Sequence, residues 1–135
     1  MAEENPSILN HVSIAVSNVE KSLPFYDAVL GTVGAVRIME HPGAVAYGKF
    51  FPEFWVHPEA FDGGQAETAN GIHFSFNAVS KEQVQAFYDA AITNGGTDDG
   101  PPGPRPDYGE PYFGCFVKDP DGHKLEATFW DESLA

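Results

Sequence analysis

The chain has a single cysteine, no long hydrophobic run and few basic residues. Cys115 cannot form an intrachain disulfide, so the fold must depend on its core, as is typical of proteins in a reducing compartment. No apolar stretch approaches the roughly 20 residues of a membrane span, and the amino terminus lacks the basic start and apolar run of a signal peptide. We therefore expect a cytoplasmic protein with no membrane partner.

The charge balance is strongly acidic. Seven Lys and Arg residues stand against 20 Asp and Glu residues, which gives a formal net charge of −13. A charge of this sign repels phosphate backbones at long range, so nucleic acid is not an expected partner. The apolar content of 42% is typical of a packed globule, and 135 residues suit one core. We predict a single domain over residues 1–135.

An internal repeat with an offset of 62 residues runs through the chain. The segment HVSI at residues 11–14 aligns with HFSF at 73–76, and FYDA at 25–28 aligns with FYDA at 87–90, with no gap between the two matches. Such a period indicates the duplication of one supersecondary unit. We therefore predict two tandem modules, at about residues 8–57 and 71–131.

In each copy the hydrophobic period changes from two residues to about 3.6, which indicates a strand followed by a helix. Pro24 costs an interior hydrogen bond, so the first helix either starts late, near Ser22, or has a distorted first turn. Ser80 is the expected cap of the second helix. The predicted strands lie at 9–16, 35–40, 44–50, 54–57, 72–77, 112–118 and 124–130, and the helices at 18–30 and 80–94. A further strand is expected to begin near Gly96 and to give way to a Pro- and Gly-rich loop at 99–108.

These elements predict an α+β fold built from two tandem βαβββ modules. In each first strand the apolar residues alternate with a small or polar set that includes His11 in one copy and His73 in the other. The helices should cover the apolar faces, so both histidines should point away from the helices. A hairpin is expected at residues 119–122, because Asp-Pro-Asp-Gly suits a tight turn.

Three side chains are candidates for a metal site. His11 and His73 occupy the same place in the two copies, and Glu126 lies on the last predicted strand. If the copies pair pseudo-symmetrically, these side chains converge. Two imidazoles and one carboxylate suit a divalent Zn, Ni, Fe, Mn or Co ion. The alternative is that both histidines are half-buried sheet residues hydrogen-bonded to the backbone.

Two longer motifs point to a known family. The sequence KSLPFY at 21–26 leads to Leu30-Gly31, and FVKDPDG at 116–122 is followed by Leu125-Glu126. Together with the first-strand histidines, they resemble the vicinal oxygen chelate superfamily of glyoxalases, bleomycin-resistance proteins and extradiol dioxygenases. The resemblance implies that the modules curl into a cup-shaped, barrel-like mixed sheet with helices outside. It also implies the metal ligands His11, His73 and Glu126, with Glu126 as the candidate catalytic residue.

The chain departs from glyoxalase I at one position. In that enzyme the last strand of the first module supplies a fourth ligand, a glutamate, whereas Trp55 stands at the expected place here. The fourth ligand would then be water, or Glu53 or His57 if the register differs by two residues. With Trp55 lining the pocket instead, the remaining two-histidine, one-carboxylate set is also that of the Fe(II) dioxygenases of this superfamily.

Other residues are candidates for substrate contacts. Arg105 lies between two prolines and is predicted either to bind a substrate carboxylate in bidentate fashion or to form a surface ion pair. Tyr47 and Tyr112 could each offer a hydroxyl group to a ligand or pack in the core. His123 lies beside a turn and is expected to be exposed.

Three functions are compatible with these features. The first is a metal-dependent enzyme of the glyoxalase I-like type that carries out lyase or isomerase chemistry on a small oxygenated substrate. The alternatives are an Fe(II) extradiol-type dioxygenase and a metal-free, bleomycin-resistance-like binding protein with an acidic, aromatic-lined groove. Because the superfamily closes its cups either within one chain or between two chains, the pseudo-symmetric plan favours a homodimer.

Overall fold

The structure, a computed structural model, describes residues 4–135. The expectation that the amino terminus carries no signal peptide includes residues 1–3, which lie outside the described residues. Among the helices in the described part, none combines the length and the apolar character that a membrane span needs.

The first module is one four-stranded sheet with one helix. Its elements are β1 (Val12–Ala15), α1 (Val19–Gly31), β2 (Val36–His41), β3 (Ala44–Gly48) and β4 (Phe54–His57). The strand order is β1-β4-β3-β2. Strand β1 runs parallel to β4, whereas β4, β3 and β2 form an antiparallel meander.

The second module repeats this plan. Its elements are β5 (His73–Asn77), α2 (Lys81–Thr93), β6 (Thr97–Pro104), β7 (Tyr112–Lys118) and β8 (Lys124–Trp130), with short 3₁₀ turns at Pro106–Tyr108 and Glu132–Leu134. The strand order is β5-β8-β7-β6, and β5 runs parallel to β8. The predicted α+β fold with two tandem βαβββ modules is therefore confirmed.

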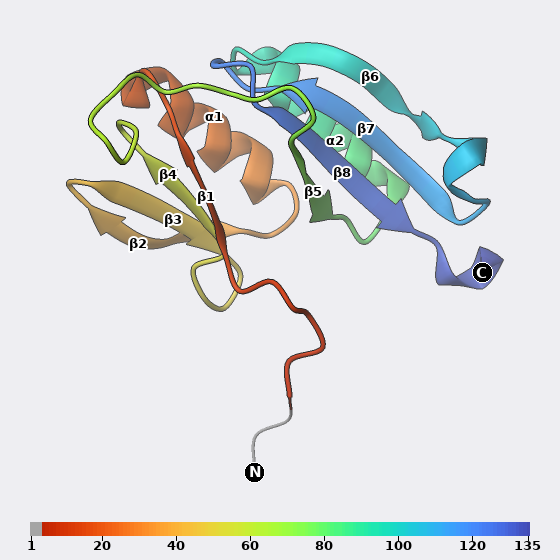
Figure 1. The fold of residues 1–135 in the computed structure, drawn as a ribbon. Coiled ribbons are helices and arrows are strands. Elements are labelled where there is room, and N and C mark those ends of the chain that lie inside the picture. Colours follow the sequence, from red (N-terminus) through yellow and green to blue (C-terminus); the bar gives the residue numbers. More distant parts are fainter. Residues whose placement is uncertain (1–3) are drawn as a thin grey trace.

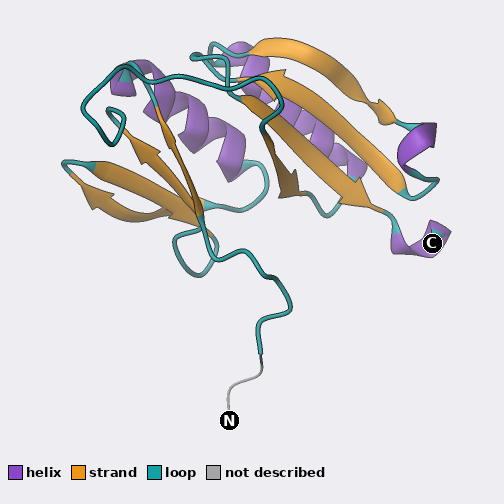
Figure 2. Ribbon diagram, viewed as in Figure 1, coloured by secondary structure: helices purple, strands orange, loops and turns teal. Residues whose placement is uncertain are grey.

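The two sheets are separate and are not closed into a barrel within one chain. Figures 1 and 2 show the sheets next to each other, with α1 beside the first sheet and α2 beside the second. The helices contact each other, and Phe54 of β4 packs against Phe74 and Phe76 of β5, with ring centroids 5.9 and 5.3 Å away. The modules are thus joined through their helix-facing sides. No described helix covers the opposite, open face of either sheet, although the connection at 59–67 borders β1 and β4 on the first one.

Both helices begin where side chains can cap them. The Ser80 hydroxyl accepts a hydrogen bond from the backbone N–H of Gln83, as predicted for α2. In α1 the Asn18 side chain accepts from the N–H of Glu20, so the helix starts at Val19 and not near Ser22. The helix continues through Pro24 to Gly31 and lacks one interior N–H donor at Pro24.

The predicted loop at 99–108 is wrong in its first half. Strand β6 continues to Pro104 and pairs with β7, with register shifts after Asp98 and Gly100. Because β6 is the edge strand of its sheet, the prolines need no donor on the open side. Proline and glycine, which usually end a strand, are therefore compatible with this one.

The β7–β8 hairpin forms as predicted, but His123 is buried and not exposed. The Asp119 carboxylate accepts from the backbone N–H groups of Asp121 and His123, and Gly122 adopts a φ of 91°. The ring Nε2 of His123 lies 2.7 Å from the carbonyl oxygen of Ala15. This contact ties the hairpin of the second module to β1 of the first.

The core lies on the helix-facing side of both sheets. It contains mainly aromatic and branched residues, among them Phe25, Tyr26, Phe54, Phe87 and Leu125. Cys115 is fully buried in it, and burial raises the pKa of its thiol to about 11. The thiol is therefore a core group and not a candidate nucleophile.

Candidate functional site

His73 and Glu126 meet on the open face of the second sheet. Strand β5 pairs with β8 so that Ser75 lies opposite Glu126, and alternation places His73 on the same face. The Nε2 atom of His73 lies 3.0 Å from Oε1 of Glu126. The imidazole is about half exposed, whereas the carboxylate is buried, with a side-chain exposure of 9%.

The second oxygen of Glu126 is held by two hydroxyl groups. The Tyr112 hydroxyl donates to Oε2 at 2.6 Å, and the Thr128 hydroxyl donates to the same oxygen at 3.0 Å. Gly114 makes the first contact possible, because a β-carbon there would collide with the Tyr112 hydroxyl. Burial and the neighbouring Glu126 raise the pKa of Tyr112, so the phenol stays protonated and acts as a donor.

This pair lies in an open groove of about 670 Å³. Its walls are mostly aromatic and charged, and the lining residues are His73, Asp99, Gly100, Arg105, Tyr108, Tyr112, Phe116, Lys124, Glu126, Thr128 and Trp130. The groove is large enough for a small organic molecule next to Glu126. Four of the residues predicted from the sequence therefore come together: His73, Glu126, Tyr112 and Arg105.

His11 lies on the other module. It is exposed just before β1, its Nδ1 is 2.7 Å from Oδ1 of Asn10, and its ring meets Trp55 edge-on at 6.4 Å. His11 and His73 both line a cleft of about 540 Å³ between the modules. However, no group of three His, Cys, Asp or Glu side chains within residues 4–135 could hold a metal ion. One chain brings together two of the three predicted ligands.

Trp55 takes the place of a fourth ligand. Ser13 pairs with Trp55 across β1 and β4, as Ser75 pairs with Glu126 across β5 and β8. The two modules therefore place Trp55 and Glu126 at equivalent positions, which agrees with the register assumed from the sequence.

Glu53 and His57, the other candidates for a fourth ligand, lie two residues before and after Trp55. The Glu53 carboxylate accepts weakly from the N–H of Lys49 at 3.4 Å, and His57 contacts the carbonyl of Gly43 at 3.2 Å.

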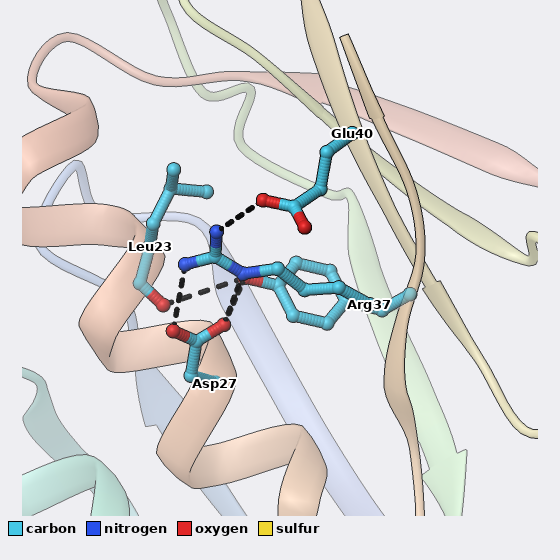
Figure 3. Close-up of polar contacts among 5 residues, drawn as sticks. Leu23, Asp27, Arg37 and Glu40 are labelled. Atoms are coloured by element: carbon cyan, nitrogen blue, oxygen red, sulfur yellow. Dashed lines mark hydrogen bonds and ion pairs between the residues drawn. The ribbon is translucent and has the colours of Figure 1, made fainter.

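Tyr47 lies on the helix-facing side of the first sheet, outside the groove that holds Glu126, and it lines the cleft between the modules that His11 and His73 also line. It is buried, and its hydroxyl donates to Asp27 Oδ1 at 2.8 Å. Arg37 holds the same carboxylate in bidentate fashion, with both contacts at 2.7 Å, and also binds Glu40 at 2.9 Å (Figure 3). The phenol predicted to bind substrate is thus used to join β3 to α1 in this structure.

We expect the Asp27 cluster to stabilise the fold only where Asp27 is ionised. Burial opposes ionisation, but hydrogen bonds from Arg37 and Tyr47 outweigh it and bring the pKa of Asp27 below its ordinary value of 3.8. A lowered pKa adds stability that is present above 3.8 and is lost as the pH falls through the folded-state pKa. Asp27→Asn should therefore lower the free energy of unfolding by about 1 kcal/mol at pH 7, because the cluster is partly exposed.

Urea denaturation at several pH values measures this effect, and Asp89→Asn is the matched control. Asp89 is the repeat equivalent of Asp27 on α2, and among the described residues its side chain accepts only from Gln85, at 3.0 Å. The control should change stability by less than about 0.5 kcal/mol. The difference between wild type and Asp27→Asn should shrink as the pH falls below 3.8 and disappear once the pH is below the folded-state pKa of Asp27. A difference that persists in acid would show that the cluster does not act through its charge.

Lys124 and Phe116 are site residues that sequence reasoning missed. The alternation of side chains along β8 could have found Lys124, because residues 124, 126, 128 and 130 share one face. Phe116 joins them because it lies opposite Glu126 in the pairing of β7 with β8. An alternation argument centred on Glu126 would thus have recovered most of the groove.

The donor chemistry of the His73–Glu126 pair fits a divalent metal ion. An imidazole nitrogen and a carboxylate oxygen are ligand types that Zn, Ni, Fe, Mn and Co share. The hydrogen bond from Tyr112 to the other carboxylate oxygen is the kind of outer contact that orients a ligand. The pair supplies two ligands, so a third donor has to come from outside this groove.

Comparisons with known proteins agree with this architecture. A family model described as Glyoxalase/Bleomycin resistance protein/Dioxygenase superfamily matches residues 8–127. The crystal structure of a glyoxalase/bleomycin resistance protein from Albidiferax ferrireducens T118 is 35% identical, with a TM-score of 0.80 over 90% of this chain and 98% of that chain. A search of curated proteins found no match.

Two more distant structures share the fold alone. A glyoxalase-related enzyme from Fulvimarina pelagi is 20% identical, with a TM-score of 0.70 over 93% of this chain and 88% of that chain. A lactoylglutathione lyase from Agrobacterium tumefaciens is 14% identical, with a TM-score of 0.61 over 93% of this chain and 95% of that chain.

Proposed function

This chain belongs to the glyoxalase/bleomycin resistance protein/dioxygenase superfamily, and from that premise we propose that it is a metal-dependent enzyme acting on a small oxygenated molecule. The observation that carries the proposal is the His73–Glu126 pair, in which a half-exposed imidazole meets a buried carboxylate in an open groove. The proposed reaction class is lyase or isomerase chemistry of the glyoxalase I-like type.

We propose that the third ligand is His11 of a second copy. His11 and Trp55 occupy the open face of the first sheet, whereas His73 and Glu126 occupy the open face of the second. Since the helix-facing sides of the two modules already pack together, each open face is left for another chain to cover. A homodimer with two-fold symmetry would form two identical sites in this way. The buried thiol of Cys115 suits a cytoplasmic location.

A divalent ion held by these three residues would act as a Lewis acid toward vicinal oxygens of the substrate. The protein groups around it have separate tasks. Glu126 Oε1 faces the groove and is the candidate to bind or carry a proton, while Oε2 is fixed by Tyr112 and Thr128. The Trp55 ring would form a wall that excludes water on the opposite side of the site.

Loading the purified protein separately with Zn, Ni, Co, Mn and Fe(II), followed by elemental analysis, tests the metal site. Tyr112→Phe should keep the fold but weaken metal affinity by about 10-fold or more, because Glu126 loses a hydrogen bond that orients it. Tyr108→Phe is the matched control, since Tyr108 lines the groove and contacts Tyr112 edge-on without bonding Glu126. Equal affinities in the two variants would contradict the role of Tyr112.

One observation favours a second candidate reaction. Trp55 fills the fourth ligand position, which leaves the two-histidine, one-carboxylate set used by Fe(II) dioxygenases. Oxygen uptake by Fe(II)-loaded protein with a catechol would support that reaction over lyase or isomerase chemistry. Failure of the wild type to take up any of the five metals would overturn both and favour a metal-free binding protein.

A further inference from the structure

Two cations flank one aromatic ring in the groove next to Glu126. The Arg105 guanidinium carbon lies 5.9 Å from the centroid of Phe116, and the Lys124 ammonium lies 4.8 Å from it. The whole chain has only seven Lys and Arg residues and a net charge of −13. Two of the seven therefore lie in this groove, whose lining carries as many basic as acidic side chains, in contrast to the net charge of the whole chain.

The position of Arg105 is fixed by the backbone. Its Nη2 donates to the carbonyl of Pro101 at 2.7 Å, and its Nη1 donates to that of Pro104 at 3.2 Å. Gly100 and Gly103 leave space for the guanidinium, because a β-carbon at either position would lie 3.2 or 3.3 Å from its nitrogens. Strand β6, with its unusual run of proline and glycine, thus forms a cradle for one side chain.

Arg105 has no acidic partner among residues 4–135. Arg37, the other arginine, binds two carboxylates, and Lys124 pairs with Asp99 at 3.3 Å. The only other acid lining the groove is Glu126, whose oxygens are occupied by His73, Tyr112 and Thr128. A half-buried guanidinium with unused donors, held in one place by carbonyl groups, is suited to bind a planar oxyanion.

The groove also offers flat apolar surface. Tyr108 and Tyr112 meet edge-on at 5.0 Å, and Trp130, which is 45% exposed, lies opposite Tyr112 in the strand pairing. We propose that the substrate is a small aromatic or conjugated carboxylate, with its carboxylate at Arg105 and a neighbouring oxygen toward the His73–Glu126 pair. This inference rests on the proposed function and names the substrate class of that site.

Isothermal titration of zinc-loaded protein with three probes tests the inference. Salicylate carries a carboxylate beside a hydroxyl group, catechol carries two vicinal oxygens without a carboxylate, and inorganic phosphate is an anion without a ring. Salicylate should bind about 10-fold or more tightly than catechol. Arg105→Gln should remove that preference by weakening salicylate about 10-fold while leaving catechol unchanged, and Arg105→Lys should fall between the two.

Lys81→Gln is the matched control, because it removes one positive charge at a site outside the groove. It should bind salicylate as the wild type does. Equal binding of salicylate and catechol, or an unchanged preference in Arg105→Gln, would overturn the inference. Phosphate binding as tight as that of salicylate would show a general anion site and would overturn the carboxylate class. Metal content, measured in the same samples, reports separately on the proposed function, since Arg105→Gln should keep its zinc.

Discussion

Mixed dimers of two metal-free variants, His11→Ala and Glu126→Ala, are expected to regain metal at one of their two sites. Each variant alone should lose nearly all bound metal, since each lacks one ligand at every site. In a mixed dimer, one site combines both substitutions, whereas the other combines the intact His11 of one chain with the intact His73 and Glu126 of the other. Differently tagged chains, co-expressed and purified through both tags, can be measured by elemental analysis.

Mixed dimers of His73→Ala and Glu126→Ala provide the control. Both residues belong to the same half of the site, 3.0 Å apart in one chain, so each site of that dimer keeps one defect. No metal should return. If the His11→Ala and Glu126→Ala dimers also stay empty while the wild type loads, the site is not shared between chains. That result would leave the proposed enzyme without its third ligand.

The fold could be predicted from the sequence wherever short-range patterns decide it. Strands β4, β7 and β8 were expected at the residues where they occur, because alternation and turn residues are local signals. Strand β6 was partly missed, since proline excludes a central strand but not an edge strand, and only the strand order shows that β6 is at the edge. His123 was wrongly expected to be exposed because its partner, Ala15, is 108 residues away in the sequence.

The sequence predicts which residues form each part of the candidate site, but not how the two modules bring those parts together. The alternation of side chains along β5 and β8 places His73 and Glu126 on one face, and the repeat indicates that His11 is equivalent to His73. Alternation does not say which other part of the protein covers each face. That choice depends on long-range packing, here the contacts of Phe54 with β5, and it leaves His11 in the cleft between the modules, outside the groove that holds Glu126. The same limit applies to Tyr47, whose hydroxyl turns toward α1.

Phe54→Ala is expected to lower the free energy of unfolding by about 3–5 kcal/mol. The ring is 3% exposed and lies between the two modules, with centroids 5.3 Å from Tyr26, 5.9 Å from Phe74 and 5.3 Å from Phe76. Its removal leaves a cavity that rigid strands on both sides cannot close. Urea denaturation followed by circular dichroism and by tryptophan fluorescence measures the loss. Fluorescence is recorded in Trp130→Phe and Trp55→Phe backgrounds, so that Trp55 reports on the first module and Trp130 on the second.

Phe50→Ala is the control for Phe54→Ala, since Phe50 is the same residue type in the same module and is 92% exposed. It should change stability by less than about 0.5 kcal/mol. If the chain is one domain over residues 1–135, both probes should show a single coincident transition in the wild type. Separate transitions, or a loss in Phe54→Ala confined to the Trp55 signal, would mean that the aromatic contacts do not couple the modules. The open faces would then not be held in a fixed relation, and a site shared between two chains would lose its structural basis.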